Sequence, residues 1–270
     1  MKPFMGDSRD ASPLFNNSLL KGLSVLAAFG HERRTMNLPE IAQATGIGKS
    51  AAQRLAYTLE RLGYLRKDPT SRRYALTTKV LELGMRYVHA SPLIETATPY
   101  LLDLNTKIGE TVNLSEPSGL DMVFVVSFPG HKQISVQLPI GDRYPMYCTA
   151  AGRAYLSGLT RIKSDALVES SDLRRYTPAT ILDPTRIKEL IDRARSAGYA
   201  FAEGEVFRGD INLAAPVFGR DGAPVAAVGV SVPVTRWSFE RAVSEIAPEV
   251  LDAARAISSP TSRQHYSSPL

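Results

Sequence analysis

Cysteine, long apolar runs and paired histidines are scarce or absent in this sequence. Its single cysteine, Cys148, permits no internal disulfide and no cysteine-based zinc site, which fits the reducing cytoplasm. The four histidines have no paired spacing, so no metal motif is present, and we expect no metal or other cofactor. Apolar runs such as residues 122–126 are far too short to cross a bilayer, which argues against a membrane partner.

The two ends of the chain are expected to lie outside its folded parts. Residues 1–13 lack the apolar core of a signal peptide and are typical of a mobile arm, and the Ser/Pro-rich residues 260–270 are typical of a mobile tail. No internal repeat or low-complexity block stands out. A length of 270 residues with 44% apolar and 22% charged residues suits a globular protein of two domains.

Charge is distributed unevenly along the chain. Residues 1–90 contain fourteen Lys and Arg against seven Asp and Glu, whereas residues 91–270 contain eighteen against twenty. The overall net charge of +5 therefore belongs to the N-terminal third. Such an asymmetry indicates a polyanionic partner for one domain and not for the other.

What the sequence does contain is a helix-turn-helix pattern. A short helical pattern at Pro39–Ala44 is followed by a turn at 45–48, where Gly46 allows the positive φ that a tight corner between helices needs. A second helical pattern runs from Lys49 to Leu62. Its apolar residues recur at spacings of three and four and form one face: Ala52, Leu55, Ala56, Leu59 and Leu62.

The opposite face of the second helix is polar. Arg and Gln side chains match the edges of guanine and adenine in the major groove, although a merely solvated helix face has the same composition. The candidate DNA-contacting residues on this helix are Lys49, Ser50, Gln53, Arg54 and Tyr57.

A basic hairpin follows the second helix. Gly63 ends the helix, a strand begins at Tyr64 and the chain returns at 74–76. The cations of the turn, which are placed to contact phosphates, are Arg66, Lys67, Arg72 and Arg73. A surface hairpin with no DNA contact is the alternative. The order of these parts predicts a winged helix-turn-helix domain over residues 14–76, with a double-stranded DNA operator as its partner.

Residues 77–90 predict a linker helix, which Thr77 or Thr78 can cap. One apolar stripe holds Val80, Leu83 and Tyr87, and a second holds Leu81, Met85 and Val88. A helix with two apolar stripes needs two surfaces to bury them, so we expect it to pack on its own domain and on a second subunit. An interior helix of a monomer is the alternative. Residues 91–92, Ser-Pro, break the helix.

The remainder, residues 91–259, predicts an α+β domain around an antiparallel sheet, with a pocket between the sheet and its covering loops. The expected helices are 93–108, 149–158, 162–170, 184–197 and 239–257. The expected strands are 111–115, 121–128, 133–138, 212–218 and 224–232, with a loop at 139–147.

Several segments in this order resemble the IclR family of bacterial transcription regulators, over about residues 18–257. The segments are 18–29, 38–65, 74–84, 139–157, 198–205 and 211–233. The resemblance implies an N-terminal winged helix, a linker helix and a GAF-like effector domain. It also implies homodimers that can pair into homotetramers, and a small organic effector that is often a carboxylate.

The resemblance also implies the positions of an effector pocket. The backbone amides of Thr149, Ala150 and Ala151 match a helix start that receives the acid group, where unpaired N–H groups and the helix dipole favour an anion. Ala202 stands where some members carry an aspartate, so either Glu203 or Glu205 takes that part or the pocket lacks this acidic contact. The other pocket positions are Tyr144, Cys148, Glu203, Asn212 and Ser231. A satisfied structural polar group is the alternative for each of these side chains.

An enzyme is a further alternative. Cys148 at a helix start would have a depressed pKa and His131 could act as its base, but no orienting acid can be assigned, so a buried structural cysteine is favoured. We therefore predict a non-enzymatic, effector-responsive, sequence-specific DNA-binding regulator, either repressor or activator. The alternatives are a GAF-like sensory or catalytic domain fused to a DNA-binding module, and an unrelated winged-helix adaptor with a structural second domain.

Overall fold

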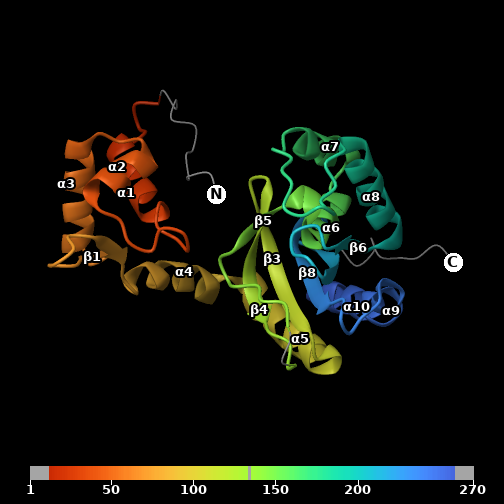
Figure 1. The fold of residues 1–270 in the computed structure, drawn as a ribbon. Helices are drawn as coiled ribbons and strands as arrows, with labels where there is room; N and C mark the ends of the chain where they lie inside the picture. The colour runs from red at the N-terminus through yellow and green to blue at the C-terminus, as the bar shows by residue number, and fades with distance from the viewer. Residues whose placement is uncertain (1–11, 133–134, 259–270) are drawn as a thin grey trace. The chain divides into compact units, whose positions relative to one another are not determined.

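The structure, a computed structural model, describes residues 12–132 and 135–258 (Figure 1). The expected tail and residues 1–11 of the expected arm lie outside this part. The chain divides into two compact units between Tyr87 and Val88, within the segment expected to be the linker. In the described part, no helix is long and apolar enough to cross a membrane.

The N-terminal unit contains the predicted helix-turn-helix. Its helices are α1 (Asn17–Ala27), α2 (Leu38–Thr45) and α3 (Lys49–Arg61). Asn37 and Glu40 form a capping box that starts α2, and Gly46 ends it with a φ of 69°. Ala52, Ala56 and Leu59 of α3 are buried against α1 and α2. Leu62 was expected on the same face but is 52% exposed, because it caps the end of α3 and lies beyond its last turn.

The predicted hairpin follows as β1 (Leu65–Lys67) and β2 (Tyr74–Leu76), paired antiparallel. Tyr74 also bridges to Met36, so the hairpin is attached to the segment that precedes α2. Arg66 and Lys67 belong to β1, and the turn itself is residues 68–73. The fold of this unit is a winged helix-turn-helix.

Helix α4 (Lys79–Ala90) begins two residues after Thr77, whose hydroxyl accepts a hydrogen bond from the backbone amide of Lys79. None of its residues is buried, and Leu81, Leu83 and Tyr87 are 64%, 49% and 51% exposed. This exposure does not favour the alternative of an interior helix in a monomer. Ser91 then caps the next helix and Pro92 opens it, as the break at this point predicted.

The C-terminal unit is the predicted α+β domain with a six-stranded antiparallel sheet in the order β5-β4-β3-β8-β7-β6. The strands are β3 (Thr111–Ser118), β4 (Asp121–Phe128), β5 (Arg143–Pro145), β6 (Ala200–Glu203), β7 (Asp210–Phe218) and β8 (Pro224–Pro233). The helices are α5 (Pro92–Ile108), α6 (Ala150–Gly158), α7 (Arg161–Glu169), α8 (Pro184–Ala197), α9 (Phe239–Glu245) and α10 (Ala247–Ile257).

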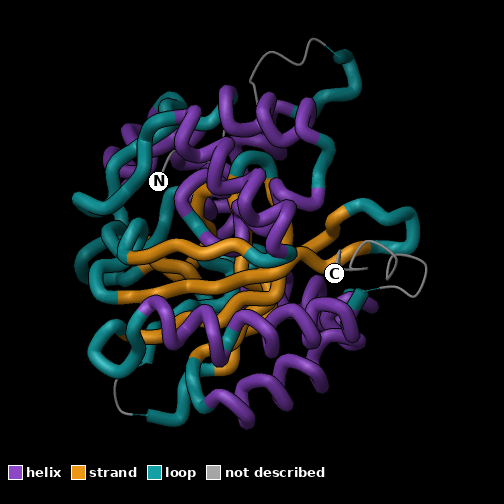
Figure 2. The backbone as a smooth tube through the Cα atoms, turned by 90° about the vertical axis from the view of Figure 1, so that its right-hand side faces the viewer, coloured by secondary structure: helices purple, strands orange, loops and turns teal. Residues whose placement is uncertain are grey.

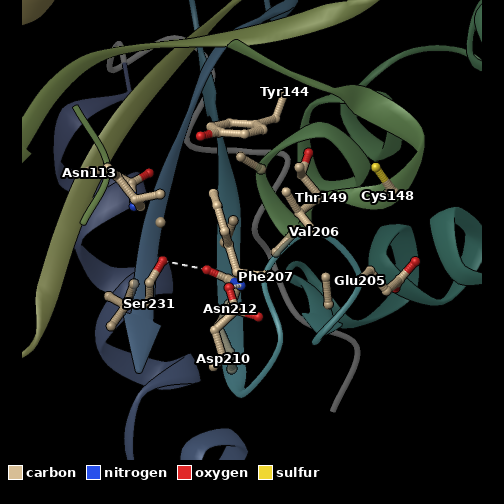
Figure 3. Close-up of a pocket in the computed structure, with 18 of the residues that line it drawn as sticks. Asn113, Tyr144, Cys148, Thr149, Glu205, Val206, Phe207, Asp210, Asn212 and Ser231 are labelled. Carbon is tan, nitrogen blue, oxygen red and sulfur yellow. Dashed lines mark hydrogen bonds between the residues drawn. The ribbon is translucent and has the colours of Figure 1, made fainter. Parts of the chain in front are cut away.

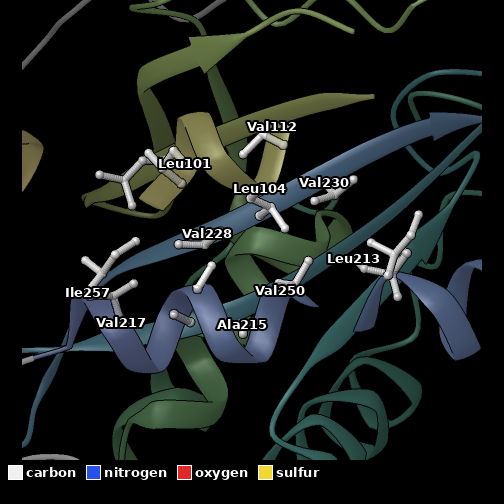
Figure 4. Packing of buried hydrophobic residues seen from close by; sticks show 14 of the residues in the cluster. Leu101, Leu104, Val112, Leu213, Ala215, Val217, Val228, Val230, Val250 and Ile257 are labelled. Carbon is white, nitrogen blue, oxygen red and sulfur yellow. The ribbon is translucent and has the colours of Figure 1, made fainter. Parts of the chain in front are cut away.

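Helices cover both faces of the sheet (Figure 2). On one face, valines 228 and 230 of β8 pack in a hydrophobic cluster with Leu104 of α5 and Val250 of α10 (Figure 4). Side chains alternate between faces along a strand, so Ser231 points to the face that α6 covers, and Gly229 leaves space on that same face. Register then fixes which residues are neighbours there. Asn113 of β3 lies opposite Gly229, and Asn212 of β7 lies opposite Ser231.

Three expectations for this unit are corrected. A strand was expected at 133–138, but residues 135–138 are not a strand, and 133–134 lie outside the described residues. The segment that pairs with the edge of β4 is β5, which was expected to be loop. The expected helix 239–257 is two helices that meet at Ile246, because Pro248 in the first turn of α10 cannot donate the hydrogen bond that a continuous helix would need. The four-residue strand β6 was not predicted.

Candidate functional site

The outer face of α3 carries all five predicted DNA-contacting residues of that helix. Lys49, Ser50, Gln53, Arg54 and Tyr57 are exposed, opposite the face buried in the core of the unit. Polar and cationic side chains on one exposed helix face are the arrangement that contacts base edges and phosphates in a major groove.

The four predicted hairpin cations differ in their surroundings. Arg66 and Arg72 are exposed, and Arg72 has a φ of 57°. Lys67 is half-buried, with its Nζ 5.3 Å from the ring centroid of Tyr74. The guanidinium of Arg73 donates to Thr35 and to Glu40 Oε2, at 2.9 and 2.6 Å. Arg73 therefore attaches the hairpin to the start of α2.

A pocket lies in the C-terminal unit between α6 and the sheet face of β3, β8 and β7 (Figure 3). Seven of the eight residues predicted for an effector pocket line it: Tyr144, Cys148, Thr149, Ala150, Ala151, Asn212 and Ser231. Glu203 does not line the pocket and is exposed, because side chains alternate along β6 and its neighbour Ala202 takes the inward position.

The start of α6 forms one wall of the pocket with its backbone. Thr149 caps the helix: its hydroxyl accepts the amide of Gly152 at 3.1 Å and donates to the carbonyl of Pro145 at 2.9 Å. The amides of Ala150 and Ala151 are the first two of the helix, so they have no carbonyl within it to donate to. Gly152 makes this turn possible, since a Cβ there would lie 2.2 Å from Met146 Cα.

The pocket floor is a row of polar side chains on the sheet. Ser231 donates to Asn212 Oδ1, and Asn212 Nδ2 donates to Asp210 Oδ2 at 2.8 Å. Burial raises the pKa of Asp210 to about 6. Beside this row, Asn113 lies over Gly229, where a Cβ would come within 2.7 Å of Asn113 Oδ1.

Asp210 and Asn113 were not predicted. The available signal was alternation: Asp210 and Asn212 are spaced by two in an otherwise apolar strand, as are Gly229 and Ser231. Two polar residues at this spacing must point to the same face of a sheet. Asn113, between Val112 and Leu114, repeats the pattern in β3.

Aromatic rings form a further wall. The ring of Tyr144 lies 5.8 Å from that of Phe124 and 5.3 Å from that of Phe207, both as centroid distances. Phe207 belongs to the loop between β6 and β7, which is flanked by Gly204 and Gly209, with φ of 60° and 80°. The space inside the pocket that water molecules can occupy is about 40 Å³, so two or three waters would fill it.

Glu205 lines the pocket, but its carboxylate is already paired. Its two oxygens accept from the two terminal nitrogens of Arg153 at 2.6 and 2.7 Å, and the amide of Ile181 donates to one of them at 3.2 Å. Arg153 and Glu205 are only 1% and 4% exposed. The pair ties the loop between β6 and β7 to α6, and it already engages both carboxylate oxygens of Glu205.

The enzyme alternative finds no support in this geometry. Burial raises the pKa of the Cys148 thiol to about 12, which is the opposite of the depressed value that a nucleophile needs. The ring of His131 hydrogen-bonds to Asn105 of α5 at 2.9 Å, away from the start of α6. Across the described residues, no cluster of His, Cys, Asp and Glu could hold a metal ion.

Both units match known proteins. Residues 18–69 match the IclR helix-turn-helix domain, and residues 85–259 match the C-terminal domain of bacterial transcriptional regulators of the IclR type. The Pca regulon regulatory protein of Pseudomonas putida is 32% identical over 256 residues, which are 94% of this chain and 86% of that protein.

Solved structures show the same architecture. An IclR family transcriptional regulator from Brucella abortus, 26% identical, matches with a TM-score of 0.77 over 95% of this chain and 96% of that one. An IclR homolog from Microbacterium hydrocarbonoxydans in complex with 4-hydroxybenzoate, 21% identical, matches with a TM-score of 0.73 over 92% and 99%. With its winged helix and its pocketed C-terminal domain, the chain belongs to the IclR family of bacterial transcriptional regulators, which are DNA-binding proteins and not enzymes.

Proposed function

We propose that this regulator binds a specific operator and that a small organic acid, bound between α6 and the sheet, changes its affinity for that operator. Residues 14–76 are the DNA-binding domain, 77–90 the linker helix and 91–259 the effector-binding domain. The observation that carries the proposal is the position of the Ala150 and Ala151 amides in the pocket wall. These amides donate to the acid group, and the positive end of α6 stabilises its charge.

On DNA, α3 enters the major groove with Gln53 and Arg54 on base edges, while Arg66 and Arg72 contact phosphates. The exposure of these four side chains supports this division. Arg73 has a different part, because its guanidinium is already bonded to the start of α2. Arg73 holds the hairpin at the position from which Arg66 and Arg72 reach the phosphates of the DNA backbone.

The regulator acts as a homodimer in which a second subunit covers α4. The support is the exposure of Leu81, Leu83 and Tyr87, which is large for apolar side chains on one helix. The geometry of the dimer sets the distance between its two α3 helices, and α4 connects each α3 to its effector-binding domain. An effector changes operator affinity only to the extent that it binds the two dimer geometries unequally.

The effector is an aromatic acid. Phe124, Tyr144 and Phe207 supply flat apolar surface for a ring, and the amides at α6 supply the site for its carboxylate. The similarity to a regulator crystallised with 4-hydroxybenzoate supports the same class. A small aliphatic acid is the second candidate, because the open space of the pocket, about 40 Å³, is small.

A ring needs more space than the pocket offers in this structure. Phe207 is partly exposed and lies in a loop flanked by two glycines with positive φ, Gly204 and Gly209. Movement of this loop widens the pocket without disturbing the sheet, and Phe207 then covers the ring. Glu205, bonded to Arg153, limits how far the loop moves.

The test uses the full-length protein and an operator selected from random duplexes. Benzoate, 4-hydroxybenzoate, pyruvate and acetate are titrated into the protein by calorimetry, and operator affinity is measured with and without each acid. We expect at least one aromatic acid to bind without being consumed and to change operator affinity. An operator affinity that no acid alters, together with no heat of binding for any of them, would refute the proposal.

A further inference from the structure

Among the described residues, the charged side chains that line the pocket between α6 and the sheet are both acids (Figure 3). They are Glu205 and Asp210, and no described lining residue is Lys, Arg or His. The charge of Glu205 is balanced by Arg153, which binds both of its oxygens. Asp210 has no such partner in the described part of the chain, so its charge is the one that an entering ligand meets.

Asp210 is poorly stabilised as a carboxylate. It is 2% exposed, its Oδ2 accepts a hydrogen bond from Asn212 Nδ2 at 2.8 Å, and its Oδ1 has no partner within the described residues. A buried carboxylate keeps its charge readily when it accepts two or three hydrogen bonds. Burial raises the pKa of Asp210 to about 6, against the opposing effect of the bond from Asn212, and the charge of Glu205 adds to the rise. Near pH 7 this side chain therefore gains a proton easily.

The other groups that face Asp210 inside the pocket do not gain or lose charge near pH 7. Burial raises the pKa values of Tyr144 and Cys148 to about 12, so both remain neutral. The carboxylate of Glu205 is held by Arg153 through both of its oxygens. Asp210 is therefore the group of the described lining whose charge depends on pH near neutrality.

The remaining charged groups nearby lie outside the cavity. Glu203 of β6 and Arg208 of the loop between β6 and β7 are exposed, and neither lines the pocket. On the other side of β7, strand β8 ends at Pro233, and Arg236 beyond it binds Glu110. Neither of these two arginines therefore balances a negative charge inside the pocket.

An acid bound at α6 brings a second unbalanced negative charge into the same small cavity. The open space is about 40 Å³, and the residues that line it include Ala150 and Ala151 as well as Asp210. Like charges in a poorly hydrated pocket oppose each other's ionisation. The bound acid therefore strengthens proton binding by Asp210, and by reciprocity a proton on Asp210 strengthens binding of the acid.

We propose that the carboxylate of the effector binds together with a proton that Asp210 takes up from the solvent, so that this regulator responds to its effector at lower concentration in mildly acidic than in alkaline conditions. The proposal rests on the proposed binding of an acid at α6 and adds a regulatory device to it. The proton also turns a carboxylate oxygen of Asp210 from an acceptor into a donor, which suits a pocket that receives an anion.

Linkage determines how affinity should depend on pH. Between the pKa of Asp210 in the free protein and its higher value in the complex, affinity for the acid falls by up to tenfold for each pH unit, and outside that interval it is constant. Because the pKa in the free protein is about 6, the fall begins near pH 6. We therefore expect the acid to bind at least fivefold more weakly at pH 8 than at pH 6.

The experiment measures binding of benzoate and pyruvate to the full-length protein by calorimetry at pH 6, 7 and 8. Both ligands are fully ionised over this range, so their own protonation does not contribute. Repeating the titration in buffers of different ionisation enthalpy counts the protons taken up, and we expect about half a proton for each acid bound at pH 7. Benzamide, the neutral counterpart of benzoate, serves as the control ligand, and its affinity should change less than twofold.

Three variants complete the design. Asp210→Asn is nearly isosteric and cannot ionise, so it should remove the pH dependence and the proton uptake, and at pH 8 it should bind benzoate at least fivefold more tightly than the wild type. Asp210→Ser, which cannot ionise either, takes its place if Asp210→Asn does not fold. Glu203→Gln removes an exposed carboxylate that does not line the pocket and should keep the pH dependence of the wild type.

The outcomes separate this proposal from the one on which it rests. An acid that binds the wild type without proton uptake, and with an affinity that changes less than twofold from pH 6 to pH 8, would overturn the linkage and leave the acid site standing. A pH dependence that survives in Asp210→Asn or Asp210→Ser would overturn the role of Asp210. Failure of both acids to bind at all three pH values would overturn the acid site and the linkage together.

Discussion

The substitution Ala150→Pro isolates the backbone contribution to the proposed acid site. Proline has no N–H, so one of the two amides that face the acid group is lost. The change is compatible with the helix, because proline is well tolerated at its first position. The residue before a proline must be extended, and Thr149 already is, with φ of −118° and ψ of 147°.

The expected loss follows from the charge of the acceptor. A hydrogen bond to a charged group contributes roughly 1.5–3 kcal/mol, which corresponds to a factor of about 10–150 in Kd. The amide of Ala151 and the positive end of α6 remain, so we expect weakened binding of the effector and not its abolition. Operator binding without effector should stay unchanged, because α6 is not part of the winged helix.

Arg161→Pro is the matched control. Arg161 is the first residue of α7, it follows an extended Thr160 with φ of −61° and ψ of 149°, and it does not line the pocket. Its ion pair with Asp192 is largely exposed, so little stability is at stake. Calorimetry with the tightest-binding acid measures Kd for the wild type and both variants. If Ala150→Pro bound the acid within twofold of Arg161→Pro, the amides of α6 would not be the acid site.

Three further predictions concern DNA, pH and assembly. Arg54→Ala should cost about 1–3 kcal/mol of binding free energy on the selected operator and less on random duplexes. Arg72→Ala should weaken binding to both equally and lower the slope of log affinity against log salt concentration by about one. Binding titrations at several salt concentrations measure both effects, and equal losses of affinity on the two duplexes for Arg54→Ala would show that Arg54 does not contact bases. The pKa of Asp210 is raised from 3.8 to about 6 on folding, so the folded state binds the proton of this carboxyl more tightly than the unfolded state does. Asp210 therefore stabilises the folded state fully below pH 4, and this stabilisation is lost as the pH rises through 6. When the pH is lowered from 7 to 4, the unfolding free energy of the wild type should rise by up to about 3 kcal/mol relative to that of Asp210→Asn. Urea titrations of both proteins at the two pH values measure this, and a difference in unfolding free energy that does not change with pH would disprove it. Replacing Leu81 and Leu83 together by Asp should give monomers in sedimentation at micromolar concentration, and an unchanged mass would place the dimer contact elsewhere.

The long, strongly periodic elements were predictable from the sequence, and the short ones were not. The bounds of β4 and α8 agree with the prediction at both ends, because eight to fourteen residues show a complete pattern. Strands β5 and β6 have three and four residues, too few to show alternation. Their existence depends on pairing with β4 and β7, and a segment this short carries no pattern that shows such pairing.

The pocket divides in the same way. The start of α6 is a local feature, because Thr149 as a cap followed by small residues is visible in the sequence. The resemblance to the family then predicted this helix start as part of the pocket. The floor is not local. Asn113, Asp210 and Ser231 come from three strands, and only the register of β3, β8 and β7 decides where each lies on the shared face: Asn113 is opposite Gly229, and Asp210 is opposite Pro233, four residues further along β8. Asp210 was missed although its spacing of two from Asn212 was visible, and Glu203 was placed in the pocket because strand β6, in which Ala202 takes the inward position, was not predicted.

The crowding at Gly152 bears on how this pocket can change during evolution. A Cβ at that position would overlap Met146, so even alanine is excluded, and the turn that presents the two amides has almost no freedom to vary. The amides themselves belong to the main chain, and ordinary side-chain replacements at 150 and 151 do not remove them. The floor, by contrast, consists of side chains that can be exchanged singly. With the acid site proposed here, a regulator of this design can therefore acquire a new effector by altering its sheet residues while the turn that presents the amides is inherited unchanged.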